Sequence, residues 1–529
     1  MPLSVTVTSP GVSVGILAPD LRRPLTSRRA RPLVSTPELA AVAALTLLAA
    51  ALRFARIGHQ GFWFDEANTA LLVHFSPGKM IGLIPQTEST PPLYYCVAWA
   101  WARVFGYGEA GLRSLSALAG LLTVPVVFAA GRKLISVRAG LIAAALTASN
   151  PVLIWYSQEA RSYELLVLLT SLSLLAFAYA RARPTPRSLA AWVIASAVAL
   201  ATHYYAVLAV VPEAIWLLVV HRRRRPVQIA VAVVGLCGLG LIPLAISQHG
   251  TGRSTWISSS PLRRRLGQIV PQFAAGFDGP AHGVLEPVSL AIVVLALVLL
   301  VLARSSDAAR RGALVAAGLA LAGFLLSLLL VAVGFDDLLT RNMLGLWPAC
   351  ALLVAGGLAV ARPRFVGVVA AVALCVIGLT TAGAVAFDRG LERPDWRVVA
   401  RALGTRPPAG GRAILVQHYK DLLPLSLYMP DLKSWRGHGG VRVSEFDVVS
   451  FTSPPSAGFC WWGAACNLWP SRMQASYPVA GFRPVSLRHA LQFSILRIVA
   501  PHPVRLTQGE ISRVLTSTHL VNDELLTQR

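Results

Sequence analysis

Residues 286–303 read EPVSLAIVVLALVLLVLA, and from Pro287 onward this stretch contains no charged side chain. A helix that crosses the hydrocarbon core of a bilayer needs about 17–25 such residues. Outward from this stretch the chain holds further apolar runs of similar length, near residues 36–54, 110–131, 139–156, 163–181, 188–220, 227–247, 312–333, 342–361 and 364–385. The run 188–220 is too long for one span and is interrupted at Thr202–Tyr205, so the sequence predicts eleven membrane helices.

The composition of the chain supports this prediction. Of the 529 residues, 55% are hydrophobic and only 14% are charged, against about a quarter in soluble proteins. The formal net charge is +24, and the basic residues form short clusters between the apolar runs. Such clusters suit lipid headgroups and topology signals, so membrane lipids are expected partners and nucleic acid is not.

The basic clusters also predict the topology. The arginines in residues 22–31 and the basic residues in 132–138 are expected in the cytoplasm. Only one of the segments Pro91–Phe105 and Leu112–Gly131 can then cross between them. We expect the shorter, aromatic Pro91–Phe105 to lie in the membrane interface. Arg263–Arg265 fall in an outer loop, where we expect them to contact headgroups or substrate.

Three regions follow from this pattern. Residues 1–34 are expected to be a disordered cytoplasmic tail, 35–386 the membrane domain, and 387–529 a small α/β domain outside the membrane. In the outer domain, Cys460 and Cys466 enclose a short loop and are expected to form a disulfide. The expected elements of this domain are a helix at Trp396–Leu403 and strands at Ala413–Val416, Phe446–Phe451 and Phe493–Val499.

Two adjacent carboxylates follow the first predicted span, in the motif Trp63-Phe64-Asp65-Glu66. At a membrane surface, partial desolvation raises the pKa of a carboxyl group toward the working range of a general base. The alternative interpretation is a solvated pair of acids beside interfacial aromatic residues.

A second acidic motif, YSQEARSY at residues 156–163, falls on the same predicted side and contains Glu159 and Arg161. These two could equally form an ion pair at headgroup level. Arg341 opens the tenth span and is suited to hold two phosphate oxygens, or alternatively to pair with Asp336 or Asp337. His203 and Tyr204 also lie on this side, where interfacial residues of these types are common. Because these residues all fall on the same predicted side of the membrane, we expect them to form one site. They are Asp65, Glu66, Glu159, Arg161, His203, Tyr204 and Arg341.

The order of several motifs resembles that of the GT-C class of membrane glycosyltransferases, in the bacterial branch related to protein O-mannosyltransferases and aminoarabinose transferases (family 39/83-like). The motifs are WFDEANTA, PPLYY, the run from FGYGEAGLRSL to GRKL, NPVLIWYSQEARSYELL, THYYA, an outer arginine before the tenth span and RPDWRVVARAL. Together they cover about residues 37–420.

The resemblance implies a GT-C fold and an inverting transfer of a sugar, mannose or another hexose or pentose, from a polyprenyl-phosphate donor. The acceptor would be a glycan, lipid or protein of the cell envelope, at the outer face of a bacterial plasma membrane. Asp65 aligns with the base that deprotonates the acceptor, and Glu159 and Arg161 align with site residues. Relatives carry a basic residue before Pro-Pro-Leu, whereas this chain has Thr90.

Two questions stay open at this stage. A divalent metal at Asp65, Glu66 and Glu159 is neither required nor excluded by the sequence. A polytopic transporter of a lipid-linked or envelope substrate is the alternative function. Transporters place charges near the middle of the membrane, whereas Glu164 and Glu213 are expected near helix ends here.

Overall fold

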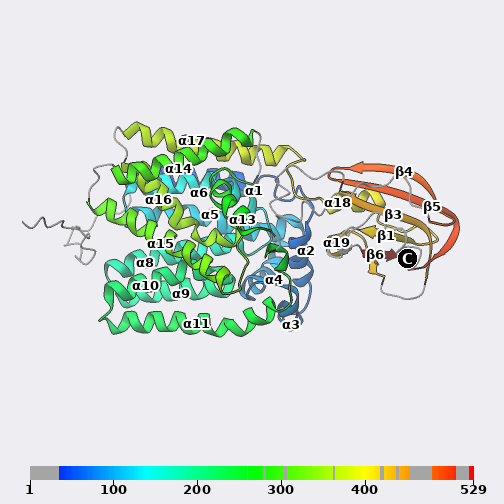
Figure 1. Cartoon of the computed structure of the whole chain (residues 1–529), viewed down its shortest axis with the longest axis horizontal. Helices are drawn as coiled ribbons and strands as arrows, with labels where there is room; N and C mark the ends of the chain where they lie inside the picture. The colour runs from blue at the N-terminus through cyan, green and yellow to red at the C-terminus, as the bar shows by residue number, and fades with distance from the viewer. Residues whose placement is uncertain are drawn as a thin grey trace, which may run out of the picture. The chain divides into compact units, whose positions relative to one another are not determined.

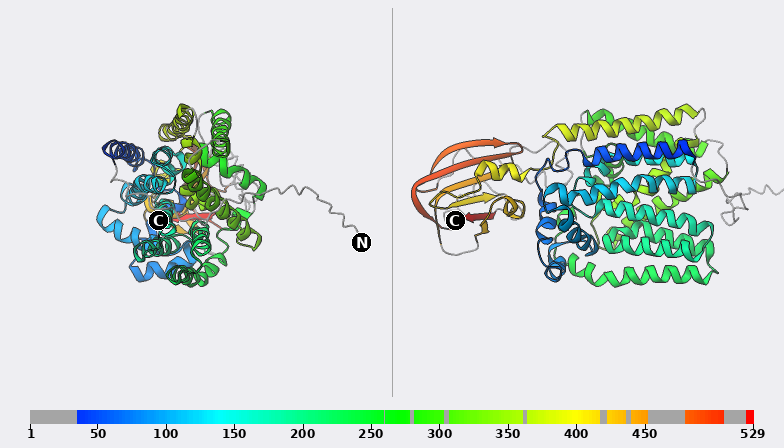
Figure 2. Two further views of the ribbon diagram at one scale, coloured as in Figure 1. Left: turned by 90° about the vertical axis from the view of Figure 1, so that its left-hand side faces the viewer. Right: turned by 180° about the vertical axis from the view of Figure 1, so that it is seen from behind.

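The computed structural model describes residues 35–258, 260–277, 281–302, 307–360, 364–416, 422–435, 440–451, 479–507 and 524–529. In these ranges nine helices are long and apolar enough to cross a membrane. They run side by side in the views of Figures 1 and 2, which confirms the prediction of a polytopic helical membrane protein. They are α1 (Thr36–Phe54), α5 (Glu109–Leu134), α8 (Tyr163–Ala182), η1 with α10 (Tyr204–Ala206, Val207–His221), α11 (Arg225–His249), α14 (His282–Leu302), α15 (Asp307–Ala332), η2 with α16 (Thr340–Leu346, Trp347–Val360) and α17 (Arg364–Phe387).

The other two predicted spans are shorter or broken. The predicted span 139–156 is split into α6 (Val137–Ser149) and α7 (Pro151–Ser157), which meet at an angle of 56°. Pro151 lacks an N–H and disfavours helical geometry at Asn150, whose side chain instead caps α7 by accepting from the Leu153 N–H. The remaining span is α9 (Pro186–Thr202), an apolar helix of 17 residues. The bend at Asn150 sets the direction in which the chain reaches the acidic motif.

Several short helices lie between the long ones. The segment that we expected in the membrane interface is α4 (Leu93–Phe105), with 13 residues. The others are α2 (Phe64–Leu72), α3 (Pro77–Thr87), α12 (Thr255–Ser258) and α13 (Leu262–Ala275). The Asp65-Glu66 pair lies in the first turn of α2.

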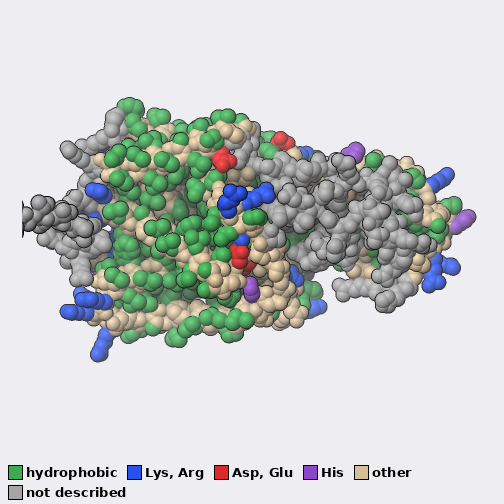
Figure 3. All heavy atoms as spheres, viewed as in Figure 1, with side chains coloured by type: hydrophobic (Ala, Val, Ile, Leu, Met, Phe, Trp, Pro, Cys, Tyr) green, Lys and Arg blue, Asp and Glu red, His purple; other side chains and the backbone are tan. Residues whose placement is uncertain are grey.

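The long helices pack closely inside and present apolar side chains outside. A Cβ on Gly131 of α5 would lie 2.7 Å from the Cα of Gly140 of α6, so only glycine permits this approach of the two backbones. Exposed side chains on α11, such as Leu236 and Ile246, are apolar, and green side chains dominate the surface of the long helices in Figure 3. This surface is typical of helices that face lipid.

Glu213 corrects one expectation about the helix ends. It lies in the middle of α10, fully buried, where its carboxylate accepts a hydrogen bond from the Trp192 indole N–H at 2.8 Å and one from the Ser173 hydroxyl at 2.5 Å. These contacts join α8, α9 and α10. The residue therefore stabilises helix packing in the interior of the bundle.

The described residues of the C-terminal part form a six-stranded sheet in the order β2-β6-β1-β3-β5-β4. Strands β1 and β3 are parallel and every other neighbouring pair is antiparallel. Helix α18 covers the sheet through Trp396, which contacts the ring of Phe493. The expected helix and strands are confirmed, within the elements α18 (Trp396–Leu403), β1 (Arg412–Val416), α19 (Leu422–Tyr428), β2 (Lys433–Ser434), β3 (Val441–Phe451), β4 (Arg483–Ala490), β5 (Phe493–Leu506) and β6 (Glu524–Gln528).

Candidate active site

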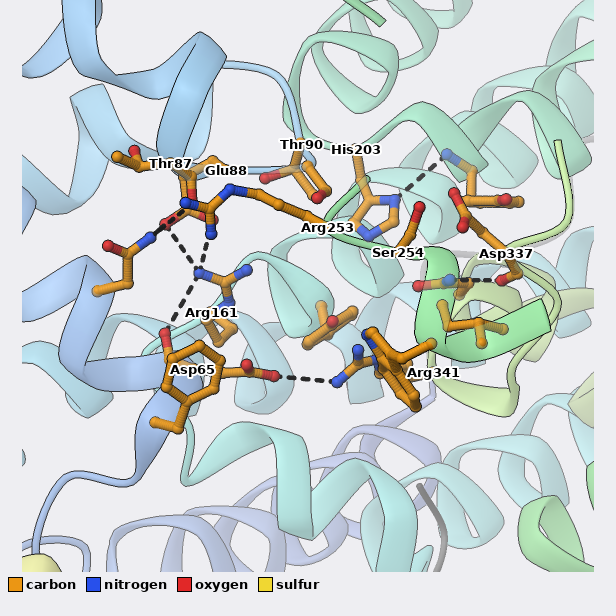
Figure 4. Close-up of a pocket in the computed structure, with 18 residues that line it drawn as sticks. Asp65, Thr87, Glu88, Thr90, Arg161, His203, Arg253, Ser254, Asp337 and Arg341 are labelled. Carbon is orange, nitrogen blue, oxygen red and sulfur yellow. Dashed lines mark hydrogen bonds and ion pairs between the residues drawn. The ribbon is translucent and has the colours of Figure 1, made fainter. Parts of the chain in front are cut away.

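A pocket opens where the loops between the helices converge, and it contains about 840 Å³ of space between atoms, including its mouth. Four of the predicted site residues line it, namely Asp65, Arg161, His203 and Arg341 (Figure 4). They come from four separate parts of the chain. The other lining residues are Phe64, Asn68, Thr87, Glu88, Ser89, Thr90, Tyr163, Tyr205, Arg253, Ser254, Trp256, Ile257, Asp337 and Asn342.

Asp65 and Arg341 form an ion pair inside the pocket. Nη1 of Arg341 donates to Oδ2 of Asp65 at 3.0 Å, although the residues are 276 positions apart in the sequence. Both side chains are mostly buried, with 16% and 13% of their surface exposed. The Arg341 guanidinium also lies over the Trp256 ring, 5.5 Å from its centroid. The cation and the expected base are therefore in direct contact.

Of the two alternative partners of Arg341, Asp336 pairs with Arg265 and Asp337 lines the same pocket. Asp336 accepts two hydrogen bonds from Arg265, at 2.6 and 2.7 Å. Arg265 is buried, so the expectation of a headgroup contact is wrong for this residue. Arg263 and Arg264 are exposed, and their expected contacts stay predictions. The ion pair of Arg265 with Asp336 fixes the loop before η2, and Arg341 is the second residue of η2.

Arg161 makes its ion pair with Glu88 and Glu159 makes its own with Arg393, which differs from the alternative interpretation of a pair between Glu159 and Arg161. Nη1 of Arg161 donates to the two Glu88 oxygens at 2.9 and 3.1 Å. Burial by itself would lower the pKa of Arg161, but Glu88, Tyr95 and Asp65 together outweigh it and raise that pKa. Glu88 also accepts from the Asn68 amide at 2.6 Å. Arg161 is thus a permanently charged group at the wall of the pocket.

His203 is buried between two arginines of the site. Burial, together with the charges of Arg161 and Arg341, lowers the pKa of His203 to about 3. Its Nδ1 accepts from the Tyr205 N–H at 3.2 Å. The imidazole is therefore neutral near neutral pH and is too weak a base to remove a proton from a hydroxyl group.

Two charged lining residues, Arg253 and Glu88, were not predicted from the sequence. Arg253 reaches the pocket from the loop after α11 and donates from Nε to the Gln86 carbonyl at 2.8 Å. Glu88 holds Arg161, as described above. Both residues lie in segments that were expected on the same side as the site, but neither belongs to a recognisable motif.

Three predicted site residues lie outside the pocket lining. Glu66 is fully buried, and Arg113 donates to both of its oxygens at 2.7 and 2.6 Å. Glu159 pairs with Arg393 at 3.1 Å, and burial, opposed by Arg393, raises the pKa of Glu159 to about 7. Tyr204 donates to the side chain of Gln248 at 2.7 Å. These three residues do not line the pocket, and their contacts stabilise the segments next to it.

The suggested metal ligands are not assembled into a metal site. Asp65, Glu66 and Glu159 each pair with a different arginine. In the described residues no group of three or more His, Cys, Asp or Glu side chains is placed to hold a metal ion. Cys460 and Cys466 lie outside the described residues, so their disulfide stays a prediction.

Comparison with known proteins agrees with this architecture. Residues 89–247 match the family described as Dolichyl-phosphate-mannose-protein mannosyltransferase. No curated protein matches the chain in sequence. Apo ArnT from Cupriavidus metallidurans is similar in structure, with a TM-score of 0.55 and 13% identity over 87% of this chain and 98% of that chain. ArnT from the same organism bound to undecaprenyl phosphate gives 0.54 and 13% over 88% and 98%. The chain therefore has the fold of these ArnT structures, in agreement with the resemblance to the GT-C class.

Proposed function

We propose that this protein is an inverting glycosyltransferase that moves a sugar from a polyprenyl-phosphate donor to a hydroxyl group of an acceptor. The observation that carries the proposal is the contact between Asp65 and Arg341 in a pocket that also contains Arg161 and Arg253. A carboxylate can accept a proton, and guanidinium groups can hold phosphate oxygens. The pocket thus combines the two functions that this reaction needs.

In the proposed step, Asp65 takes the proton of the acceptor hydroxyl as its oxygen attacks the anomeric carbon of the donor sugar. The bond between that carbon and the phosphate oxygen breaks, and polyprenyl phosphate leaves with the bonding electrons. Arg341 and Arg161 stabilise the charge that develops on the phosphate. One displacement without a covalent intermediate inverts the anomeric carbon.

The donor class has independent support from the similar proteins. The ArnT structure contains undecaprenyl phosphate, and the matched family is described by dolichyl-phosphate-mannose. We infer a lipid-phosphate donor carrying mannose or another hexose or pentose. We further propose an envelope glycan, lipid or protein as acceptor, and a site at the outer face of a bacterial plasma membrane.

The test is turnover by the purified protein. It is incubated with polyprenyl-phosphate mannose, glucose and arabinose in turn, and the release of polyprenyl phosphate is measured. Asp65→Asn should reduce turnover at least about 10²-fold, because the amide cannot take the proton. Asp388→Asn, at an exposed acid after α17, is the matched control. No release from any donor by correctly folded wild type would contradict the proposal.

A further inference from the structure

The segment between α17 and α18 contacts the start of α2, close to Asp65, and the loop that carries Arg161. Within this segment Glu392, Arg393 and Asp395 are buried, although all three are charged residues. Burial of ionisable side chains is costly unless they are paired and hydrogen-bonded. Arg393 and Asp395 belong to the motif RPDWRVVARAL, from which the sequence predicts no function for either residue.

Arg393 is the centre of these contacts, and only 4% of its side chain is exposed. Its guanidinium donates to the carbonyl of Trp155 at 2.8 Å, to that of Gln158 at 3.1 Å and to Glu159 at 3.1 Å. It also lies over the Trp155 ring, 4.0 Å from the centroid. The Trp63 ring, two residues before Asp65, is 6.0 Å away. One side chain therefore contacts both segments.

The contact with Glu159 leads directly to two pocket residues. Glu159 precedes Ala160, whose N–H donates to Glu66 at 2.8 Å, and Glu66 is the neighbour of Asp65. Next in the chain is Arg161, which contacts the backbone oxygen of Asp65 and pairs with Glu88. A shift of the loop around Glu159 would therefore displace the proposed base and a proposed phosphate ligand together.

The C-terminal part of the chain supports the Asp65 loop at a second place. Tyr428 of α19 accepts a hydrogen bond from the Phe62 N–H at 2.6 Å and donates to Glu109 at 2.8 Å. Arg397 of α18 also pairs with Glu109, at 3.4 Å. The loop that carries Asp65 is thus held between α5 and two helices of the C-terminal part.

We propose that Arg393 is a positioning residue for the transferase reaction, and that the C-terminal part completes the active site by fixing the Asp65 and Arg161 loops through it. This inference rests on the proposed function, because it assigns Arg393 to the same site. Arg393 does not line the pocket and acts through Glu159.

The test compares Arg393→Gln, Arg393→Lys and the control Arg389→Gln, an exposed arginine of the same segment. Two readouts are needed, steady-state kinetics with a donor that wild type uses and equilibrium binding of polyprenyl phosphate in lipid nanodiscs. Displacement by about 1 Å can reduce turnover about 10²-fold. We therefore expect Arg393→Gln to lower kcat and to raise the donor KM and the Kd, each at least about tenfold. Arg389→Gln should match wild type.

The lysine variant separates geometry from charge, since an ammonium cannot reach all three oxygens in this arrangement. It should show a defect of the same kind as the glutamine variant. Because Arg393 acts through Glu159, Glu159→Gln combined with Arg393→Gln should be little worse than Arg393→Gln alone. Arg393→Gln protein with wild-type kcat, KM and Kd per folded molecule would overturn the inference, even with lower thermal stability. Wild type that binds polyprenyl phosphate without turning over any donor would contradict only the proposed function, and the Kd comparison would still decide the role of Arg393.

Discussion

Asp65→Asn should separate chemistry from donor binding, because Asp65 is both the proposed base and the partner of Arg341. In the structure its carboxylate accepts a hydrogen bond at 3.0 Å from the guanidinium of Arg341, which we propose as the phosphate ligand. A donor phosphate must therefore share Arg341 with Asp65 or displace it. Removing the charge of Asp65 should lower turnover and at the same time make polyprenyl phosphate bind more tightly.

The expected gain in affinity for polyprenyl phosphate follows from the distances in the site. A phosphate on the far side of Arg341 would lie about 6 Å from the Asp65 carboxylate, since each contacts the guanidinium at about 3 Å. Two like charges at this distance repel by about 2.8 kcal/mol at an effective dielectric constant of about 20. Allowing for screening, about 1–2.7 kcal/mol is relieved, which corresponds to roughly 5- to 100-fold tighter binding.

The assay is equilibrium binding of polyprenyl phosphate to wild type, Asp65→Asn and Asp337→Asn in nanodiscs, with kcat measured in parallel. Asp337→Asn is the matched control because it removes a negative charge from the same pocket and leaves the Asp65–Arg341 pair in place. Equal tightening in both variants would mean that general charge, not competition for Arg341, controls binding. Weaker binding by folded Asp65→Asn would refute the reasoning outright.

Four further predictions follow from the same contacts. Arg341→Lys should reduce kcat/KM for the donor at least about tenfold, because it loses a charged hydrogen bond worth roughly 1.5–3 kcal/mol, and near-normal kinetics would argue against a phosphate ligand. Glu66→Gln should lower the thermal unfolding midpoint through a loss of about 3–5 kcal/mol, because it breaks a buried ion pair. An unchanged midpoint would contradict that role. Burial raises the pKa of Glu159 to about 7, so the folded protein binds more protons than the unfolded chain between about pH 4.5 and 7. The free energy of unfolding should therefore fall by up to about 3 kcal/mol as the pH rises through this window. The measurement is the difference in thermal unfolding midpoint between the two ends of the window, and Glu159→Gln should abolish this difference. For the topology, Gly108→Cys should react with an impermeant thiol reagent from outside and Lys133→Cys should not, and equal labelling would overturn the orientation.

The helical architecture could be predicted because spanning length and charge clusters are local properties of the sequence. Every predicted span corresponds to a helix or a bent helix pair in the structure. The predicted topology also places four residues on one side of the membrane, although their contacts could not be predicted. These four, Asp65, Arg161, His203 and Arg341, do line one pocket. The break at Asn150 was missed because a proline within an apolar run can begin a new helix or only bend an existing one.

The ion-pair partners could not be predicted, because each carboxylate had several arginines on its side of the membrane. Arg341 had Asp336 and Asp337 close in sequence, yet it pairs with Asp65. Arg161 had Glu159 two residues away, yet it pairs with Glu88. Such choices depend on side-chain directions over distances of a few ångströms, which only the packed loops determine. The partners matter for function, since they decide which cations face the pocket.

The different positions of Asp65 and Glu66 show how one motif can serve both chemistry and support. Adjacent residues on an α-helix point about 100° apart, so the two neighbouring carboxylates in the first turn of α2 meet different surroundings. Asp65 faces the pocket and meets Arg341. Glu66 turns inward, where Arg113 and the Ala160 N–H occupy its oxygens. The paired glutamate thereby restrains its neighbour, and the proposed base needs such a fixed direction to meet an acceptor hydroxyl at hydrogen-bond distance.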